Sequence, residues 1–168
     1  LHHAGLGRQA AAMASIFYRD RQFMLDHDGH WINRQVDATI VSPDPHGLRR
    51  SYVTSIAHDL WLHGYAPTAN DIVFDVGAGI GEEALALAPS VGHIYAIEAH
   101  PDTFRCLQKT IALSNLRNVT AIHCALTDQD GQVRISTGRS HLANSVGDQG
   151  EEVRARSLES LCRELGVA

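Results

Sequence analysis

The chain has 168 residues, of which 44% are hydrophobic and 20% are charged, and its formal net charge is −5. This composition is typical of a globular domain large enough to bury a core. The 14 basic residues form no long run, so the sequence predicts no nucleic-acid partner. The three cysteines, Cys106, Cys124 and Cys162, lack C-x-x-C spacing. This favours reduced thiols in a cytoplasmic protein over a disulfide framework or a metal site.

Residues 1–70 are expected to form an N-terminal lead-in of helices and a hairpin. An amphipathic helix is predicted within residues 7–25; its apolar run is too short to cross a membrane, and no signal-peptide cleavage pattern follows it. We therefore expect no membrane partner. Short strands are predicted at residues 31–32 and 38–41, and apolar side chains at helical spacing predict a helix over residues 48–63.

A strand, a glycine turn and a helix-forming segment follow one another from residue 71 to residue 88. The run Ile72–Val76 is apolar and β-branched, as in a strand buried on both faces of a parallel sheet. Gly77, Gly79 and Gly81 then lead into the helix. This order opens a nucleotide-binding α/β fold, in which the glycines let the backbone approach a ligand and the helix N-terminus presents free N–H groups.

The spacing of the glycines leaves two cofactor classes open. The dinucleotide fingerprint G-x-G-x-x-G/A fails when it is read from Gly77, because Glu82 stands where the third glycine belongs. It is satisfied from Gly79, with Gly81 and Ala84. A nicotinamide or flavin site therefore remains an alternative.

Two carboxylates favour a cationic cofactor over a dinucleotide. Asp75 stands at the strand end just before the glycines, where it would repel a pyrophosphate and attract a sulfonium and ammonium group such as those of S-adenosylmethionine. The next strand, residues 93–98, ends in Glu98, which is placed to accept hydrogen bonds from ribose hydroxyls.

The rest of the chain predicts further α/β elements. Pro101 is expected in the first turn of a helix that ends at Ser114 and Asn115, and residues 119–124 form a third strand. A strand is predicted at 133–136, antiparallel to the third strand or its extension. The polar segment 137–150 is expected to be a loop, in which His141, Asn144 and Ser145 are candidates to face an acceptor. A strand at 152–156 and a helix between a Ser157 cap and Gly166 complete the chain.

From about residue 71 to residue 166 the chain resembles the FkbM family of methyltransferases. The motifs that carry the resemblance are Asp75–Glu82, Ile97–Pro101, Asn118–Val119 leading to Ala125–Asp128 and Asp130–Gly131, and Ser157–Leu161. The resemblance implies a class I, S-adenosylmethionine-dependent enzyme with a Rossmann-like, doubly wound, mostly parallel α/β sheet. It also implies methyl transfer to a hydroxyl oxygen of a small-molecule, sugar or natural-product acceptor, by in-line attack on the sulfonium methyl.

The resemblance also implies a cofactor site within residues 71–168. The expected cofactor-binding residues are Asp75, Gly77, Ala78, Gly79, Gly81, Glu98, Ala99, Ala125 and Asp128. Ala99 departs from the family, which commonly has proline there. A turn residue is an equally good interpretation of Asp128. No catalytic base is identified.

The family's next strand should begin just after Gly166, so the chain is expected to be incomplete at its C-terminus. The strand Ile72–Val76 would then lack a neighbour on one side, and an exposed apolar edge promotes aggregation. A homo-oligomer or a partner that completes the sheet is one expectation. The alternatives to an active enzyme are a non-catalytic cofactor-binding or interaction fragment and an NAD-dependent oxidoreductase.

Overall fold

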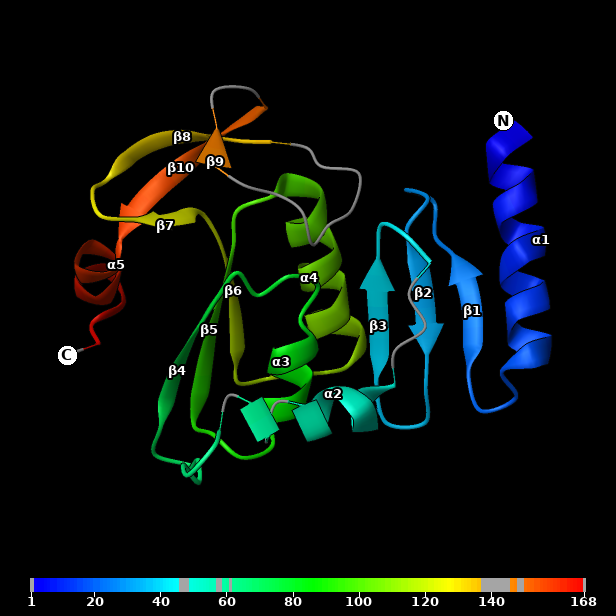
Figure 1. The fold of residues 1–168 in the computed structure, drawn as a ribbon, viewed down its shortest axis with the longest axis horizontal. Coiled ribbons are helices and arrows are strands. Elements are labelled where there is room, and N and C mark those ends of the chain that lie inside the picture. Colours follow the sequence, from blue (N-terminus) through cyan, green and yellow to red (C-terminus); the bar gives the residue numbers. More distant parts are fainter. Residues whose placement is uncertain are drawn as a thin grey trace.

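A computed structural model describes residues 2–45, 49–56, 59–60, 62–136, 146–147 and 150–167. The elements, shown in Figure 1, are α1 (His2–Phe17), β1 (Gln22–Leu25), β2 (Trp31–Arg34), β3 (Thr39–Ser42), α2 (Arg50–Ile56), β4 (Ile72–Val76), α3 (Glu82–Leu87), β5 (His93–Glu98), α4 (Pro101–Leu113), β6 (Val119–His123), β7 (Ala125–Thr127), β8 (Gly131–Ile135), β9 (Val146–Gly147), β10 (Glu151–Ser157) and α5 (Leu158–Leu165). In the described part of the chain, no helix is long and apolar enough to cross a bilayer.

The centre of the fold is a parallel sheet in the order β4-β5-β6. β5 lies in the middle, and its Ile94, Ala96 and Ile97 are at most 1% exposed because strands and helices cover them on all sides. Helices α3 and α4 cover one face of the sheet, and α5 packs through Leu161 against Phe74 and Ile97 on the other. This arrangement confirms the predicted Rossmann-like α/β fold with helices on both faces.

β4 forms one edge of this sheet. It pairs with β5 on one side, and among the described residues its other side pairs with no strand. Its first and last side chains, Ile72 and Val76, are 48% and 55% exposed. The sequence predicted this unpaired edge, and it leaves a row of backbone donors and acceptors open to an incoming strand.

The lead-in forms a second sheet, in the antiparallel order β1-β2-β3, which docks on α4. The Val41 N–H donates to Thr110 Oγ1 (3.0 Å), and the Thr39 N–H donates to Ser114 Oγ (2.9 Å). In Figure 1 this sheet lies on the far side of α4 from β4, with α1 beside β1. The predicted hairpin is thus confirmed, and it shares a core cluster with α3 and α4. The domain boundary at residue 70 stays a prediction.

One predicted segment of the lead-in is wrong in extent, and another is described only in part. The first helix ends at Phe17, and residues 22–25 are strand β1, because Phe23 is buried while its ladder pairs with β2. Within the helix predicted over 48–63, residues 50–56 form α2 and residues 59 and 60 are also helical, whereas residues 62 and 63 form a bend and a turn; residues 48, 57, 58 and 61 lie outside the described residues.

A third sheet, in the order β7-β10-β8-β9, corrects the prediction for residues 133–136. β8 does not pair with the third strand or its extension, because β10 lies between β7 and β8, parallel to the first and antiparallel to the second. Val153 of β10 packs with Ala125 and Ile135, so one strand completes a small core between the other two. The predicted ends of α4 and α5 are confirmed: Pro101 begins α4, and Gly166 follows α5 with a φ of 67°.

Candidate functional site

The glycine loop, residues 77–81, connects β4 to α3. Gly77, Gly79 and Gly81 have φ values of 77°, 55° and 93°, a region that other residues rarely adopt. A Cβ atom at Gly81 would also lie 2.9 Å from Cδ1 of Leu107, so the third glycine lets α3 pack closely on α4. A Cβ at Gly77 would meet nothing within 4 Å, which leaves open space in front of the loop.

Glu98 joins the loop to the end of the next strand. The residue is 9% exposed, and its Oε2 accepts a hydrogen bond from the Gly79 N–H at 3.0 Å. Oε1 accepts another from the His100 N–H at 2.7 Å. Each carboxylate oxygen has two lone pairs, so both can still accept from a ligand. Glu98 therefore fixes the loop and keeps acceptor capacity beside it.

Asp75 is an incompletely satisfied carboxylate on β4. Its Oδ2 is buried and has no hydrogen-bond partner among the described residues. Burial, together with the negative charges of Glu83 and Glu98, raises the pKa of Asp75 to about 7. Burial, together with the charge of Glu82, also raises the pKa of Glu83. The strand end thus has a surplus of negative charge, which favours a cation and disfavours a phosphate.

A cavity of about 450 Å³ lies between β4, α3 and residues 62–67. Of the predicted cofactor residues, Asp75, Gly77 and Gly79 line it. The remaining lining is mostly apolar, including Leu62 and Phe74. We refer to Asp75, the glycine loop and Glu98 together as the glycine-loop site.

The other predicted site residues do not line this cavity. Ala78 is 1% exposed within the loop, where its N–H and that of Gly77 both donate to the Ile97 carbonyl at 2.9 Å. Ala99 packs with Ala125, which is 5% exposed in β7 beneath β8 and β10. Asp128 is exposed in the bend after β7. His141, Asn144 and Ser145 lie outside the described residues.

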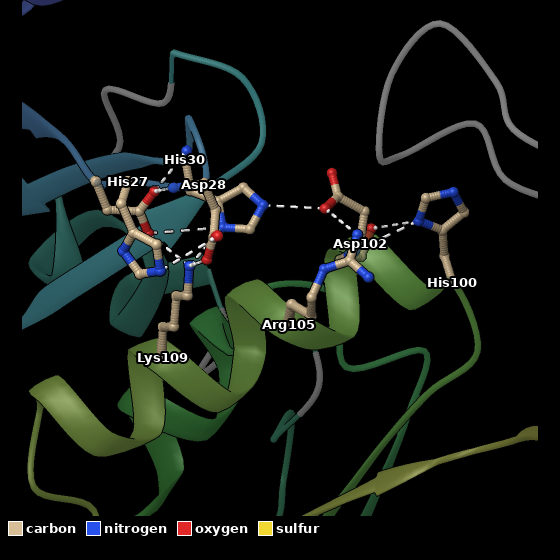
Figure 2. Close-up of polar contacts among 9 residues, drawn as sticks. His27, Asp28, His30, His100, Asp102, Arg105 and Lys109 are labelled. Carbon is tan, nitrogen blue, oxygen red and sulfur yellow. Dashed lines mark hydrogen bonds and ion pairs between the residues drawn. The ribbon is translucent and has the colours of Figure 1, made fainter.

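Sequence reasoning missed a polar cluster that ties the β1–β2 hairpin to α4. Figure 2 shows Lys109 reaching from α4 toward the hairpin, where its Nζ lies 2.5 Å from Asp26 Oδ2 and 2.6 Å from Asp28 Oδ2. The same ammonium lies 2.9 Å from Nδ1 of the buried His30, and His30 Nε2 lies 2.9 Å from Asp102 Oδ1. An ammonium can only donate, so Nδ1 accepts, and Nε2 carries the proton donated to Asp102. The alternate spacing of Asp26, Asp28 and His30 was the available sequence signal.

This cluster, called the Lys109 cluster below, also brings together three groups of metal-ligand type. The ligand atoms of Asp26, Asp28 and His30 lie within 4.8 Å of one another. Lys109 already supplies a cation to all three, so a metal ion would have to displace its ammonium. Asp102 lies in the first turn of α4, two residues after the cap residue His100, whose N–H donates to Glu98. Through His30 and Asp102 the hairpin is therefore connected to the start of α4, next to Glu98.

No protein-family model and no curated protein sequence matches the chain. Among solved structures, TYW2 of Methanocaldococcus jannaschii in complex with AdoMet is 22% identical, with a TM-score of 0.38 over 62% of this chain and 43% of that one. Trm5 of the same organism, in complex with adenosine, is 22% identical, with a TM-score of 0.43 over 56% and 29%. Precorrin 8W decarboxylase of Methanobacterium thermoautotrophicum is 29% identical, with a TM-score of 0.38 over 47% and 40%. The chain thus spans less than half the length of these proteins.

Proposed function

We propose that this chain binds S-adenosylmethionine at the glycine-loop site and serves as a methyltransferase. The observation that carries the proposal is the buried, unpartnered Oδ2 of Asp75 beside an open glycine loop that Glu98 holds in place. A carboxylate whose pKa is raised to about 7 gains most from a ligand that brings positive charge. S-adenosylmethionine brings a sulfonium and an ammonium, whereas NAD brings a pyrophosphate.

Each part of the cofactor has a complementary group in the site. Asp75 would offset its positive charge, the glycine loop would let its chain approach the backbone, and Glu98 would accept from ribose hydroxyls. Ala78 and Ala99 would act through their backbones beside these groups. Ala125 and Asp128 stay predicted contacts to the adenine.

The cofactor would supply the methyl group, and the protein would align it with an acceptor and exclude water. Alignment alone removes a large part of the barrier to a two-substrate reaction. The resemblance to the FkbM family supports a hydroxyl oxygen of a small molecule, sugar or natural product as the acceptor. The described residues include no assigned base, and the open edge of β4 supports a further strand, from a second copy or from other polypeptide, that would complete the sheet.

Calorimetric titration with S-adenosylhomocysteine tests the cofactor assignment, with NAD titrated in parallel. We expect saturable binding that Asp75→Ala and Glu98→Ala each weaken by roughly 10- to 100-fold, since hydrogen bonds to charged groups contribute about 1.5–3 kcal/mol. Glu159→Ala is the matched control, because Glu159 lies on the exposed side of α5 and pairs only with Arg163 among the described residues.

Other outcomes separate the alternatives. Binding of NAD without binding of S-adenosylhomocysteine would contradict the proposal and favour an oxidoreductase. Binding of S-adenosylhomocysteine without methyl transfer to any hydroxyl acceptor would favour a non-catalytic cofactor-binding domain. Equal weakening by Glu159→Ala would show that the loss comes from general destabilisation.

A further inference from the structure

A second cavity, of about 320 Å³, lies at one end of the N-terminal sheet and shares no lining residue with the cavity beside the glycine loop. It is formed where the α1–β1 turn meets the end of β2. The β1–β2 ladder pairs Gln22 with Arg34, so these two segments are held side by side by backbone hydrogen bonds. We call this cavity the arginine pocket; its basic lining is Arg19, Arg21 and Arg34, beside Gln22 and Gln35.

Arg21 is the anchored member of the pocket. Its side chain is only 4% exposed, and its guanidinium lies over the ring of Tyr18, 4.8 Å from the ring centroid. Its Nε lies 3.5 Å from Asp20, and the same carboxylate pairs with Arg49 at 3.1 Å. A guanidinium buried beside an open pocket has lost much of its hydration, so its attraction to a nearby anion is stronger than it would be in bulk water.

The positive charge in the pocket exceeds the negative charge. Within the described residues, the guanidinium groups of Arg19 and Arg34 form no ion pair, and Asp20 is the only acidic residue in the lining. Arg50, just beyond the rim, is paired with Asp37 at 3.1 Å. Three arginines and one aspartate therefore line the pocket, and that aspartate also pairs with Arg49.

The plain alternative is a set of solvated surface arginines. Two observations argue against it: the near-complete burial of Arg21, and the concentration of charge. Arg19, Arg21, Arg34, Arg49 and Arg50 are five of the 14 basic residues of a chain whose net charge is −5. They come from three separate segments, and folding gathers them at one end of one sheet. Like charges are gathered at a cost, which a bound anion offsets.

We infer that the arginine pocket binds a phosphate group. Guanidinium forks match phosphate oxygens in pairs, and three of them around one cavity can contact a single phosphate from several directions. The phosphate can belong to a soluble molecule or to a lipid headgroup. The second source has a structural reason: Ile16 and Phe17, at the α1 end next to the pocket, are 73% and 78% exposed and could enter a membrane interface. The inference does not depend on the proposed methyltransferase function.

Titration of the chain with pyrophosphate at low salt tests this inference. We expect saturable binding that the double variant Arg19→Ala/Arg34→Ala weakens at least about tenfold, because it removes two charged donors. Arg134→Ala/Arg163→Ala is the matched control: it removes the same charge from exposed positions outside the pocket and is expected to weaken binding less than about twofold. Arg21→Lys keeps the charge and loses the fork, so a loss of severalfold is expected from it with the fold intact.

A second experiment, binding to phospholipid vesicles, distinguishes a lipid headgroup from a soluble phosphate compound. Binding to phosphatidylglycerol vesicles that pyrophosphate competes away, and that is lost in Arg19→Ala/Arg34→Ala, would support a lipid headgroup. Pyrophosphate binding without vesicle binding would support a soluble ligand. The inference is overturned if pyrophosphate shows no saturable binding, or if both double variants weaken it equally. Far-ultraviolet circular dichroism confirms that each variant is folded before it is titrated.

Discussion

The glycine-loop site and the arginine pocket differ in charge, in origin and in position. At the first, burial raises the pKa of Asp75 and of the neighbouring Glu83, and the second is lined by three arginines and one aspartate. Both belong to a chain with a net charge of −5. The local arrangement of charge, rather than the total, therefore decides which ligand each end of the molecule can accept.

The two regions also differ in how the chain builds them. The glycine-loop site comes from one βαβ unit, residues 72–98, whose parts are neighbours because consecutive parallel strands place their C-terminal ends together. The arginine pocket depends on two turns that approach one another only after β1 and β2 have paired. Variants that disrupt one region should therefore leave the other intact, and the following predictions test that separation.

The largest effect is expected from Gly81→Ala. The new Cβ would lie 2.9 Å from Leu107 Cδ1, and φ at this position is 93°, so strain and overpacking should lower the free energy of unfolding by about 2–4 kcal/mol. Urea unfolding measures this. Gly131→Ala is the control, since a Cβ there meets nothing within 4 Å. Equal stability of the two variants would contradict the packing role, and a folded Gly81→Ala that lost pyrophosphate binding would contradict the separation of the regions.

Asp75→Asn should change the dependence of stability on pH. The pKa of Asp75 is raised from its ordinary value of 3.8 to about 7, so between these values the folded protein holds a proton that the unfolded chain has released. The free energy of unfolding of the wild type therefore falls as pH rises through this window, and the loss is complete only above about pH 7, where Asp75 is ionised in the folded protein as well. Asparagine cannot ionise, so the variant should be more stable than the wild type by about 1–3 kcal/mol at about pH 8 and nearly equal to it below about pH 4.

Thermal unfolding across pH checks this prediction. A constant difference between the two proteins at every pH would contradict the raised pKa. The same variant should lose affinity for S-adenosylmethionine, because it has no charge to offer the sulfonium. Its binding of pyrophosphate at the arginine pocket should be unchanged.

Lys109→Met should weaken the attachment of the β1–β2 hairpin to α4. The substitution leaves the largely buried Asp26 carboxylate without its cation, which should lower the free energy of unfolding by roughly 1–2 kcal/mol at neutral pH. Burial raises the pKa of Asp26, but the hydrogen bond from Lys109 and those from the backbone N–H groups of His30 and Asp28 outweigh it and hold the pKa below its usual value. That stabilisation is present above the unfolded pKa and is lost as pH falls through the folded one.

The decrease in the free energy of unfolding caused by Lys109→Met should therefore become smaller as the pH falls. Arg117→Met is a suitable control, because Arg117 is exposed in the turn after α4. Urea unfolding at several pH values measures both variants. A penalty that did not change with pH would show that Lys109 contributes through packing of its stem rather than through its charge.

The smallest effect is a difference in the response to salt. Raising the potassium chloride concentration from about 50 to about 500 mM should weaken pyrophosphate binding at least about tenfold, because screening acts on a multiply charged ligand at an open pocket. S-adenosylhomocysteine carries no net charge, so its affinity should change less than about twofold. Equal salt responses at the two sites would contradict the assigned ligand classes.

Local patterns in the sequence determined the central unit of this protein. The apolar run of β4, the alternate glycines and the acid that ends β5 each depend on a few neighbouring residues, and the predicted strands, helix and turn are all present. The ends of α4 and α5 were predictable for the same reason: Pro101 and Gly166 act through backbone angles that need no distant partner.

Only the tertiary structure decided which distant segments meet. The local pattern of β8 did not predict its partner; in the structure β10 lies beside it, and the buried Val153 side chain packs with Ile135 and Ala125. The arginine pocket and the Lys109 cluster likewise join residues from separate segments, so the alternate spacing of Asp26, Asp28 and His30 indicated only one part of the cluster and did not predict its partner Lys109. Local propensity reports the conformation of a segment, whereas side-chain packing and long-range pairing choose its partners, and here those choices created the arginine pocket and the Lys109 cluster.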